Sequence, residues 1–228
     1  MKEGDFVELN FTGKVNGKVF ETTIAEEAKK AGFYDEKRVF KPVLIVAGKK
    51  MIVPGLDEEV LNASEGNGFK SVSLSPEKAF GLKKPELLRL IPISKFKEQG
   101  IEVAPGLPLD IDGMPARVVA VEGGRVRVDF NHPLAGQNVE YSFKVEKVYS
   151  DSASKLQSAA KYFFESGVSA KLDGSTARFS VPASARKDAV FLDAKFRAID
   201  LLLNFVPDVK SVFFEEEYSA QQPHDVKA

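Results

Sequence analysis

The sequence of 228 residues contains no cysteine and no tryptophan, and its formal net charge is only −1. Without cysteine the protein has no disulfide, no thiol nucleophile and no thiolate ligand for a metal. A net charge near zero creates no overall field that would draw the protein to nucleic acid or to an anionic membrane. We therefore expect neither nucleic acid nor a membrane among its partners.

Long apolar segments are missing as well. No segment approaches the ~20 apolar residues that a membrane-spanning helix needs, and the N-terminal stretch MKEGDFVELNF contains no apolar core of signal-peptide length. The expected location is therefore the cytoplasm. There is no glycine-rich phosphate loop, and His132 and His224 are the only histidines. We expect no cofactor and no bound metal.

Phenylalanine, in contrast, is abundant, with 18 Phe against 5 Tyr. The main interpretation is that Phe fills several small hydrophobic cores, and a second is that it also lines an aromatic pocket and exposed binding surfaces. The chain is long enough for one large domain or for two to three small ones. Its hydrophobic and charged fractions, 43% and 29%, are ordinary for a globular protein.

The stretch from Gly48 to Gly81 has the most regular pattern, a short strand, a helix and a second strand. The helix is predicted by apolar residues that fall on one helical face, Leu56, Val60 and Ala63. Gly66-Asn67-Gly68 predicts the end of this helix, because these residues tolerate positive φ. In the strand that follows, Val72 and Leu74 alternate with serines, which is typical of a half-buried strand.

The residues before this stretch predict an antiparallel hairpin and a flap. The first strand is predicted by apolar residues that alternate with polar ones, Val7, Leu9 and Phe11. Asn16-Gly17 is a strong hairpin turn, and residues 19–23 form the return strand. Residues 24–38 are highly charged, with a short helix at 26–31, and predict a solvated flap. The apolar run 42–47 predicts a buried strand.

Two motifs in this region resemble those of a known family. Ile52-Val53-Pro54-Gly55-Leu56 is followed by Ser75-Pro76-Glu77-Lys78-Ala79-Phe80-Gly81. In this order they resemble the active-site half of FKBP-type peptidyl-prolyl isomerases. The resemblance implies an antiparallel sheet wrapped on a short helix, and an enzyme that accelerates rotation about X–Pro bonds. No bond breaks in this reaction, so no nucleophile or metal is required.

The resemblance also implies an apolar pocket for the prolyl ring. Its expected site residues are Phe11, Phe20, Glu21, Ile52, Val53, Leu56, Phe80 and Tyr141. Leu56 would form the floor, Val53 would also present its backbone to the substrate, and Glu21 would lie at the rim. Phe80 stands where most relatives have Tyr, so a hydroxyl that could bind substrate is missing or is replaced by Tyr141 or a backbone N–H. Taken singly, each residue is better explained as ordinary core, whereas the set, with its two motifs in order, favours the pocket.

After Gly81 the chain departs from a minimal member of this family. Residues 86–129 contain several short strand patterns and predict a small β-rich inserted domain. Residues 131–137, NHPLAGQ, precede an alternating strand and resemble the SlyD-type subgroup. In that subgroup an "insert-in-flap" domain at this place binds unfolded or extended chains. The FKBP-like domain is then expected at 1–85 and 130–150.

Residues 151–220 predict a further small domain, in the order helix, strand, strand, helix, strand. It resembles the extra C-terminal domain of long archaeal FKBPs. The apolar face of its second helix is marked by Leu192, Phe196, Ile199 and Leu203. A module of about seventy residues is marginally stable alone, so we expect its Phe-rich faces to dock onto a second copy, forming a homodimer, or onto client protein. Residues 221–228 are expected to be a flexible tail.

The sequence thus predicts an α+β protein that is both a prolyl isomerase and a folding chaperone. The insert would capture unfolded or proline-containing polypeptides, and the pocket would rotate their prolyl bonds. Two alternatives stay open. One is a holdase whose isomerase pocket is degenerate because of Phe80, and the other is an assembly protein driven by the C-terminal domain.

Overall fold

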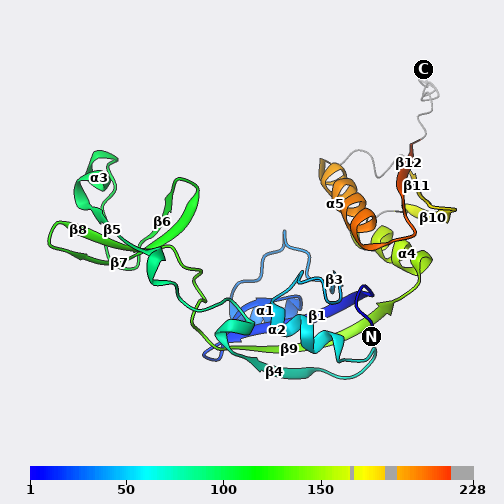
Figure 1. Ribbon diagram of the computed structural model, residues 1–228, viewed down its shortest axis with the longest axis horizontal. Helices are drawn as coiled ribbons and strands as arrows, with labels where there is room; N and C mark the ends of the chain where they lie inside the picture. Colours follow the sequence, from blue (N-terminus) through cyan, green and yellow to red (C-terminus); the bar gives the residue numbers. More distant parts are fainter. Residues whose placement is uncertain (165–166, 183–188, 217–228) are drawn as a thin grey trace, which may run out of the picture.

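A computed structural model describes the whole chain except residues 165–166, 183–188 and 217–228. It contains three β-sheets, each in its own lobe, with the N-terminal sheet between the other two lobes (Figure 1). The predicted α+β fold class is confirmed. The expected tail at 221–228, with His224, lies outside the described residues. No helix in the described part of the chain is long and apolar enough to cross a membrane.

The N-terminal lobe is built on a five-stranded antiparallel sheet. Its strands are β1 (Phe6–Val15), β2 (Lys18–Thr22), β3 (Val43–Val46), β4 (Lys70–Leu74) and β9 (Val139–Tyr149). β9 lies between β1 and β4, while β2 and β3 pair with successive parts of the other edge of β1. Asn16 and Gly17 join β1 to β2 with φ of 50° and 75°, so the predicted hairpin is present.

Short helices cover this sheet. They are α1 (Ala25–Ala31), α2 (Pro54–Leu61) and η1 (Pro76–Lys78). α2 packs against β4 and η1 and buries its apolar face. The predicted end of α2 at Gly66-Asn67-Gly68 was wrong, because the helix is capped earlier, at Asn62. The chain then turns toward the sheet, where the N–H of Gly66 donates to the carbonyl of Val145 at 3.2 Å.

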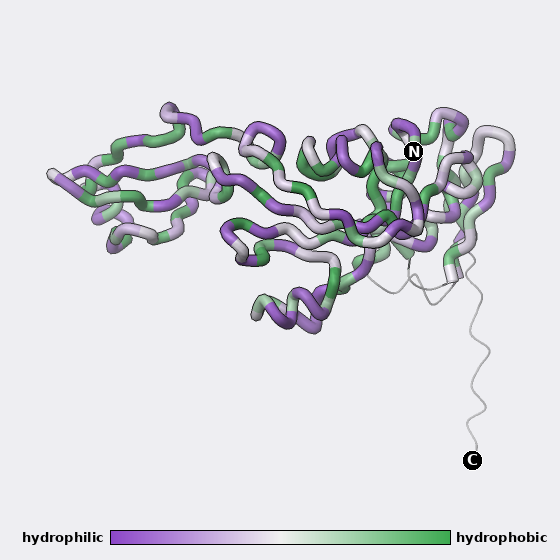
Figure 2. The backbone as a smooth tube through the Cα atoms, turned by 90° about the horizontal axis from the view of Figure 1, so that it is seen from below, coloured by the Kyte–Doolittle hydropathy of each residue, from purple (hydrophilic) through white to green (hydrophobic). Residues whose placement is uncertain are grey.

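The inserted lobe follows η1. Its elements are η2 (Pro85–Leu87), β5 (Leu88–Pro92), α3 (Ile93–Glu98), β6 (Pro108–Ile111), β7 (Met114–Glu122) and β8 (Arg125–Asp129). The strands form an antiparallel sheet in the order β5-β8-β7-β6. Hydrophobic and hydrophilic residues alternate along these strands (Figure 2), so only a small core is buried, made of Phe96, Val118, Val126 and Val128.

Two chain segments join the insert to the N-terminal sheet and lie side by side. The N–H of Gly136 donates to the carbonyl of Gly81 at 2.8 Å. The side-chain amide of Asn131 accepts from the N–H of Lys84 at 2.8 Å and donates to the carbonyl of Lys84 at 3.1 Å. Asn131 therefore binds the outgoing segment as a neighbouring strand would, which holds both ends of the insert together.

The C-terminal lobe has the predicted order of elements. They are α4 (Ser152–Phe163), β10 (Ser169–Asp173), β11 (Thr176–Val181), α5 (Ala189–Phe205) and β12 (Ser211–Glu216). β10 and β11 form an antiparallel hairpin, whereas β11 and β12 are parallel. Asp151 caps the N-terminus of α4, where its carboxylate accepts a hydrogen bond from the N–H of Ser154 at 2.9 Å.

The predicted apolar face of α5 is not the face that packs. Leu192, Phe196 and Leu203 are 59%, 70% and 45% exposed. The buried face consists instead of Phe191, Ala194, Ala198, Leu201 and Leu202. α5 carries apolar residues on both sides, and helical spacing alone did not distinguish the side that meets α4.

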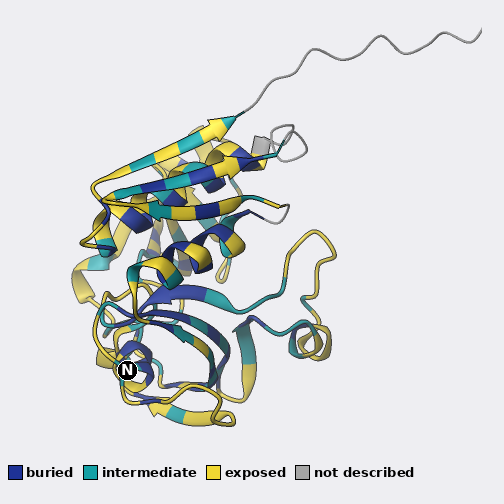
Figure 3. Cartoon of the chain, turned by 90° about the vertical axis from the view of Figure 1, so that its right-hand side faces the viewer, coloured by how far each residue is buried: buried dark blue, intermediate teal, exposed yellow. Residues whose placement is uncertain are grey.

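The core of the C-terminal lobe continues into the N-terminal sheet. Four sheet residues belong to the same buried cluster as the helices and strands of this lobe: Phe6, Leu44, Val46 and Tyr149. In Figure 3 the buried parts of the upper lobe face the buried strands below them. The Phe-rich interior of the lobe, including Phe164, Phe179 and Phe191, is therefore covered within the chain itself.

Candidate active site

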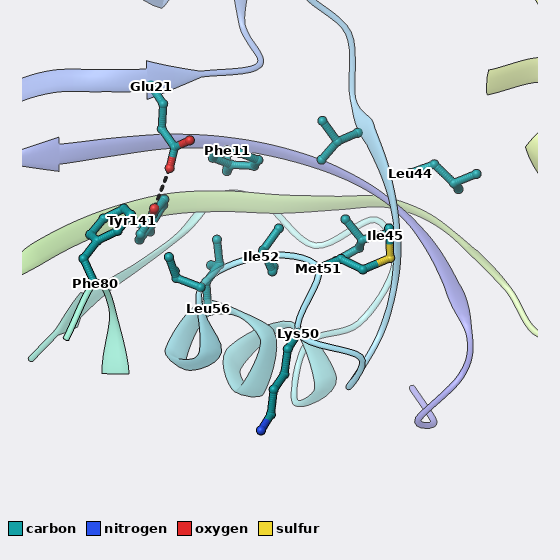
Figure 4. A pocket seen from close by; sticks show the side chains of 12 residues that line it. Phe11, Glu21, Leu44, Ile45, Lys50, Met51, Ile52, Leu56, Phe80 and Tyr141 are labelled. Carbon is teal, nitrogen blue, oxygen red and sulfur yellow. Dashed lines mark hydrogen bonds between the residues drawn. The ribbon is translucent and has the colours of Figure 1, made fainter. Parts of the chain in front are cut away.

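A cavity of about 580 Å³ opens in the N-terminal lobe between the sheet and the start of α2 (Figure 4). Its lining residues are Phe11, Glu21, Val43, Leu44, Ile45, Lys50, Met51, Ile52, Val53, Leu56, Phe80 and Tyr141. Every site residue predicted from the sequence is in this set except Phe20. The lining is mostly aromatic and aliphatic, and only Glu21, Lys50 and Tyr141 bring polar side-chain groups to it.

Phe20 lies behind the lining and supports it. Its ring meets the rings of Tyr141 and Phe80 edge-on, at centroid distances of 6.0 and 5.7 Å. Gly13 permits this packing, because a Cβ at that position would lie 2.7 Å from Phe20 and 2.9 Å from Tyr141. Sequence reasoning missed Gly13, although a glycine inside a strand can signal a close approach of this kind.

The first turn of α2 forms the floor. Leu56 is 1% exposed. Pro54 occupies the first helical turn, where its missing N–H leaves no helical hydrogen bond unmade. Gly55 is required for packing, since a Cβ there would lie 2.7 Å from Leu74 and 2.9 Å from the carbonyl oxygen of Lys78. Within the described residues, the backbone N–H of Val53 makes no hydrogen bond to the protein.

A partly buried hydrogen bond crosses one side of the cavity. The hydroxyl of Tyr141 donates to Glu21 Oε1 at 2.5 Å (Figure 4). Burial raises the pKa of Tyr141 far above its ordinary value, and the hydrogen bond to Glu21 and the charge of that carboxylate raise it further. Tyr141 therefore stays protonated, and its hydrogen is committed to Glu21. A donor to a substrate carbonyl must come from another group.

A turn before α2 completes the rim. Lys50 has a left-handed backbone with φ of 56°, and the carboxylate of Asp57 accepts hydrogen bonds from the N–H groups of Gly48 and Lys50 at 2.9 and 2.8 Å. Asp57 is 3% exposed. Neither Asp57 nor Lys50 was among the site residues expected from the sequence.

His132 also contacts the site. It lies in the loop between β8 and β9, at the boundary of the insert. Its ring stacks on Phe80 with centroids 4.5 Å apart and planes 2° apart. The N–H of Leu134 donates to His132 Nδ1 at 3.2 Å, which holds the imidazole in place. The sequence gave no spacing signal for this contact.

The described residues contain no group of three or more His, Cys, Asp or Glu side chains that could hold a metal ion. The cavity itself offers apolar walls, the hydrogen-bonded pair of Tyr141 and Glu21, and backbone groups.

Comparisons with known proteins identify the family of the chain. Residues 1–95 match the family described as FKBP-type peptidyl-prolyl cis-trans isomerase, and residues 89–134 match the IF domain of FKBP26. A short-type peptidyl-prolyl cis-trans isomerase of Methanocaldococcus jannaschii is 33% identical over 148 residues, which is 65% of this chain and 94% of that protein.

Two bacterial relatives share less of the chain. The FKBP-type 16 kDa isomerase of Escherichia coli is 32% identical over 112 residues, covering 47% of this chain and 74% of its own length. The SlyD isomerase of Aeromonas hydrophila is 30% identical over 145 residues, covering 62% of this chain and 60% of its own. The chain belongs to the FKBP-type peptidyl-prolyl cis-trans isomerases.

Proposed function

We propose that the cavity between the sheet and α2 is the site of prolyl isomerisation. The observation that carries this proposal is the apolar lining, in which every predicted site residue but Phe20 is found. Rotation about the X–Pro bond is opposed by a barrier of about 18–20 kcal/mol, which comes from the partial double bond of the amide. A dry apolar cavity removes water from the imide and favours the twisted, less polar form.

In this proposal the substrate carbonyl binds the backbone N–H of Val53. That N–H has no partner in the described chain, and Val53 stands at the mouth of α2, where the helix dipole adds positive potential. Phe11 and Tyr141 would contact the prolyl ring from the sheet side, and Leu56 would contact it from below. Glu21 would act through Tyr141, whose ring it orients.

Two tyrosines on β9 provide a matched test of the site. Tyr141 donates to Glu21 inside the cavity, and Tyr149 donates to Glu8 at 2.7 Å outside it. A hydrogen bond to a charged group contributes about 1.5–3 kcal/mol of stabilisation, which is lost when the hydroxyl is removed. We expect Tyr141→Phe to lower kcat/KM for a proline tetrapeptide by about 10-fold, and Tyr149→Phe to leave it unchanged. Equal activity of both variants would place the reaction elsewhere.

We further propose that the insert captures extended, unfolded client chains and so gives the enzyme a chaperone function. This is supported by the large apolar side chains that the insert leaves exposed, Leu88, Leu90, Met114 and Val119. It is also supported by β5, an edge strand that pairs only with β8 in the described chain. A client held there would have its prolines near the cavity at a high effective concentration.

Leu90→Ser tests this capture, with Phe69→Ser as the control. The two side chains are similarly exposed, at 56% and 52%, but Phe69 lies outside the insert. We expect Leu90→Ser to slow a proline-limited refolding reaction and to weaken suppression of aggregation, with tetrapeptide activity unchanged. Phe69→Ser should change none of the three. Equal losses for tetrapeptide and protein substrates would argue against a division of labour between insert and cavity.

We also propose that a second copy of the chain covers the exposed face of α5. Leu192, Phe196, Ile199 and Leu203 recur at spacings of four, three and four residues, the repeat by which two helices pair along a seam. Light scattering should show a dimer for the native protein and a monomer for Phe196→Asp. Arg197→Ala, its exposed neighbour, should remain dimeric. A native monomer at all accessible concentrations would exclude this arrangement.

A further inference from the structure

The strand β3 has two different partners on its two faces. Leu44 and Val46 belong to the buried core of the C-terminal lobe, at 4% and 0% exposure. Ile45 and the partly buried Val43 belong to the core beneath the cavity. Figure 4 shows Leu44 directed away from Ile45 and Met51. The same four-residue strand therefore packs on the C-terminal lobe through Leu44 and Val46 and lines the cavity through Val43, Ile45 and one part of Leu44.

A second contact joins the C-terminal lobe to the segment that leads into β3. The ammonium group of Lys41 donates to the carbonyl oxygen of Tyr162 at 2.9 Å and lies 4.8 Å from the centre of the Tyr162 ring. Tyr162 lies in the last turn of α4, which packs against both β3 and β9. α4 follows β9 after a very short connection capped by Asp151.

The position of β3 depends on these contacts. β3 is only four residues long and pairs with a single strand, β1, in the described part of the chain. Short edge strands are weakly held by their backbone hydrogen bonds, so the packing of their side chains decides where they lie. For β3 much of that packing comes from α4 and its lobe.

We infer that the C-terminal lobe is a positioning element of the prolyl site, which fixes β3 and thereby one wall of the cavity. Lys41 and Tyr162 are positioning residues that act through this strand and do not line the cavity themselves. The inference rests on the site proposed above. It assigns to the C-terminal lobe a role in substrate binding that is independent of self-association and of client capture.

The contact between Lys41 and Tyr162 can be tested in the full-length protein. The variants are Lys41→Met, Tyr162→Leu and the double variant. Phe163→Leu is the matched control, because Phe163 is the neighbouring half-buried aromatic residue on α4 and no cation of the described residues lies over its ring. Exchange NMR with a proline tetrapeptide gives kcat and KM separately, and circular dichroism verifies that each variant is folded.

We expect Tyr162→Leu to raise KM by about 3-fold, the effect of losing one cation–π contact, with kcat unchanged because the wall contacts ground state and transition state alike. Lys41→Met also removes the hydrogen bond to the backbone carbonyl of Tyr162, so it should raise KM at least as much. The double variant should be no worse than Lys41→Met alone, because that variant already lacks the cation–π contact. Phe163→Leu should leave KM unchanged.

An unchanged KM in both single variants, or an equal rise in Phe163→Leu, would overturn the inference. If the cavity is not the site of prolyl isomerisation, the result is different, because Tyr141→Phe would then retain full activity. If Tyr141→Phe lowers activity while the Lys41 and Tyr162 variants do not, the site stands and the positioning role of the C-terminal lobe is refuted.

Discussion

Gly13 allows a sharp test of how the aromatic side of the cavity is packed. A methyl group at this position would lie 2.7 Å from Phe20 and 2.9 Å from Tyr141, whereas carbon atoms in contact normally lie about 3.5–4.0 Å apart. Gly13→Ala therefore forces the rings to retreat by about 1 Å. They have little room, because Phe20 also packs on Phe80 and Tyr141 is hydrogen-bonded to Glu21.

Overpacking of this kind destabilises a core by about 1–3 kcal/mol. The backbone does not oppose the change, since Gly13 is not among the residues with positive φ. At a site with free space, Gly→Ala instead stabilises a protein by about 0.4–1 kcal/mol through the unfolded state. Gly68 is such a site, with no atom within 4 Å of its added methyl group and no positive φ.

The assay compares the two variants by urea unfolding and by tetrapeptide isomerisation. We expect Gly13→Ala to be less stable than the native protein and to lose activity, because Tyr141 lines the cavity. Gly68→Ala should be as stable as the native protein or slightly more stable, with full activity. If the two variants unfolded at the same urea concentration with the same activity, the packing argument would be refuted.

Three further predictions follow from buried polar and stacked groups. Asp57→Asn leaves one of its two N–H donors without an acceptor and should destabilise the protein by about 1–3 kcal/mol in urea unfolding, while Glu58→Gln on the exposed side should have little effect. Burial and hydrogen bonds to carboxylates raise the pKa of Tyr141 and of Tyr149 in the folded protein. In the unfolded chain the pKa of tyrosine is about 10. The two hydrogen bonds therefore stabilise the fold fully below about pH 10, and this stabilisation is lost as the pH rises above about 10. Absorbance at alkaline pH should therefore show a late tyrosinate fraction that appears only with unfolding and shrinks in Tyr141→Phe. His132→Ala should raise KM by uncovering Phe80, and His132→Phe should restore it by keeping the stack; no difference between them would show that the stack does not shape the site.

The sequence predicted those features that depend on local patterns or on the order of two motifs. The Asn16-Gly17 hairpin follows from backbone preference alone. The floor and one wall of the cavity follow from the motif around Leu56. The order of elements in the C-terminal lobe follows from alternation and helical spacing.

Features that depend on packing between distant segments were not predicted. The stack of His132 on Phe80 and the space at Gly13 involve residues far apart in the chain. α5 is apolar on two sides, and only the placement of α4 decides that Phe191 is buried and Phe196 exposed. The apolar run predicted β3 as a buried strand. An apolar run does not reveal which element packs on each face, so the contact of β3 with the C-terminal lobe was not predicted.

The place of β9 in the N-terminal sheet has a consequence for folding during synthesis. β9 lies between β1 and β4, yet it is made only after the whole insert. Until then the nascent chain carries two strands with open edges, which invite pairing with other chains. The contacts that complete the sheet are long-range and form slowly. The insert, whose contacts are local, can fold first on the ribosome and bring the two halves of the sheet together through its clamped ends.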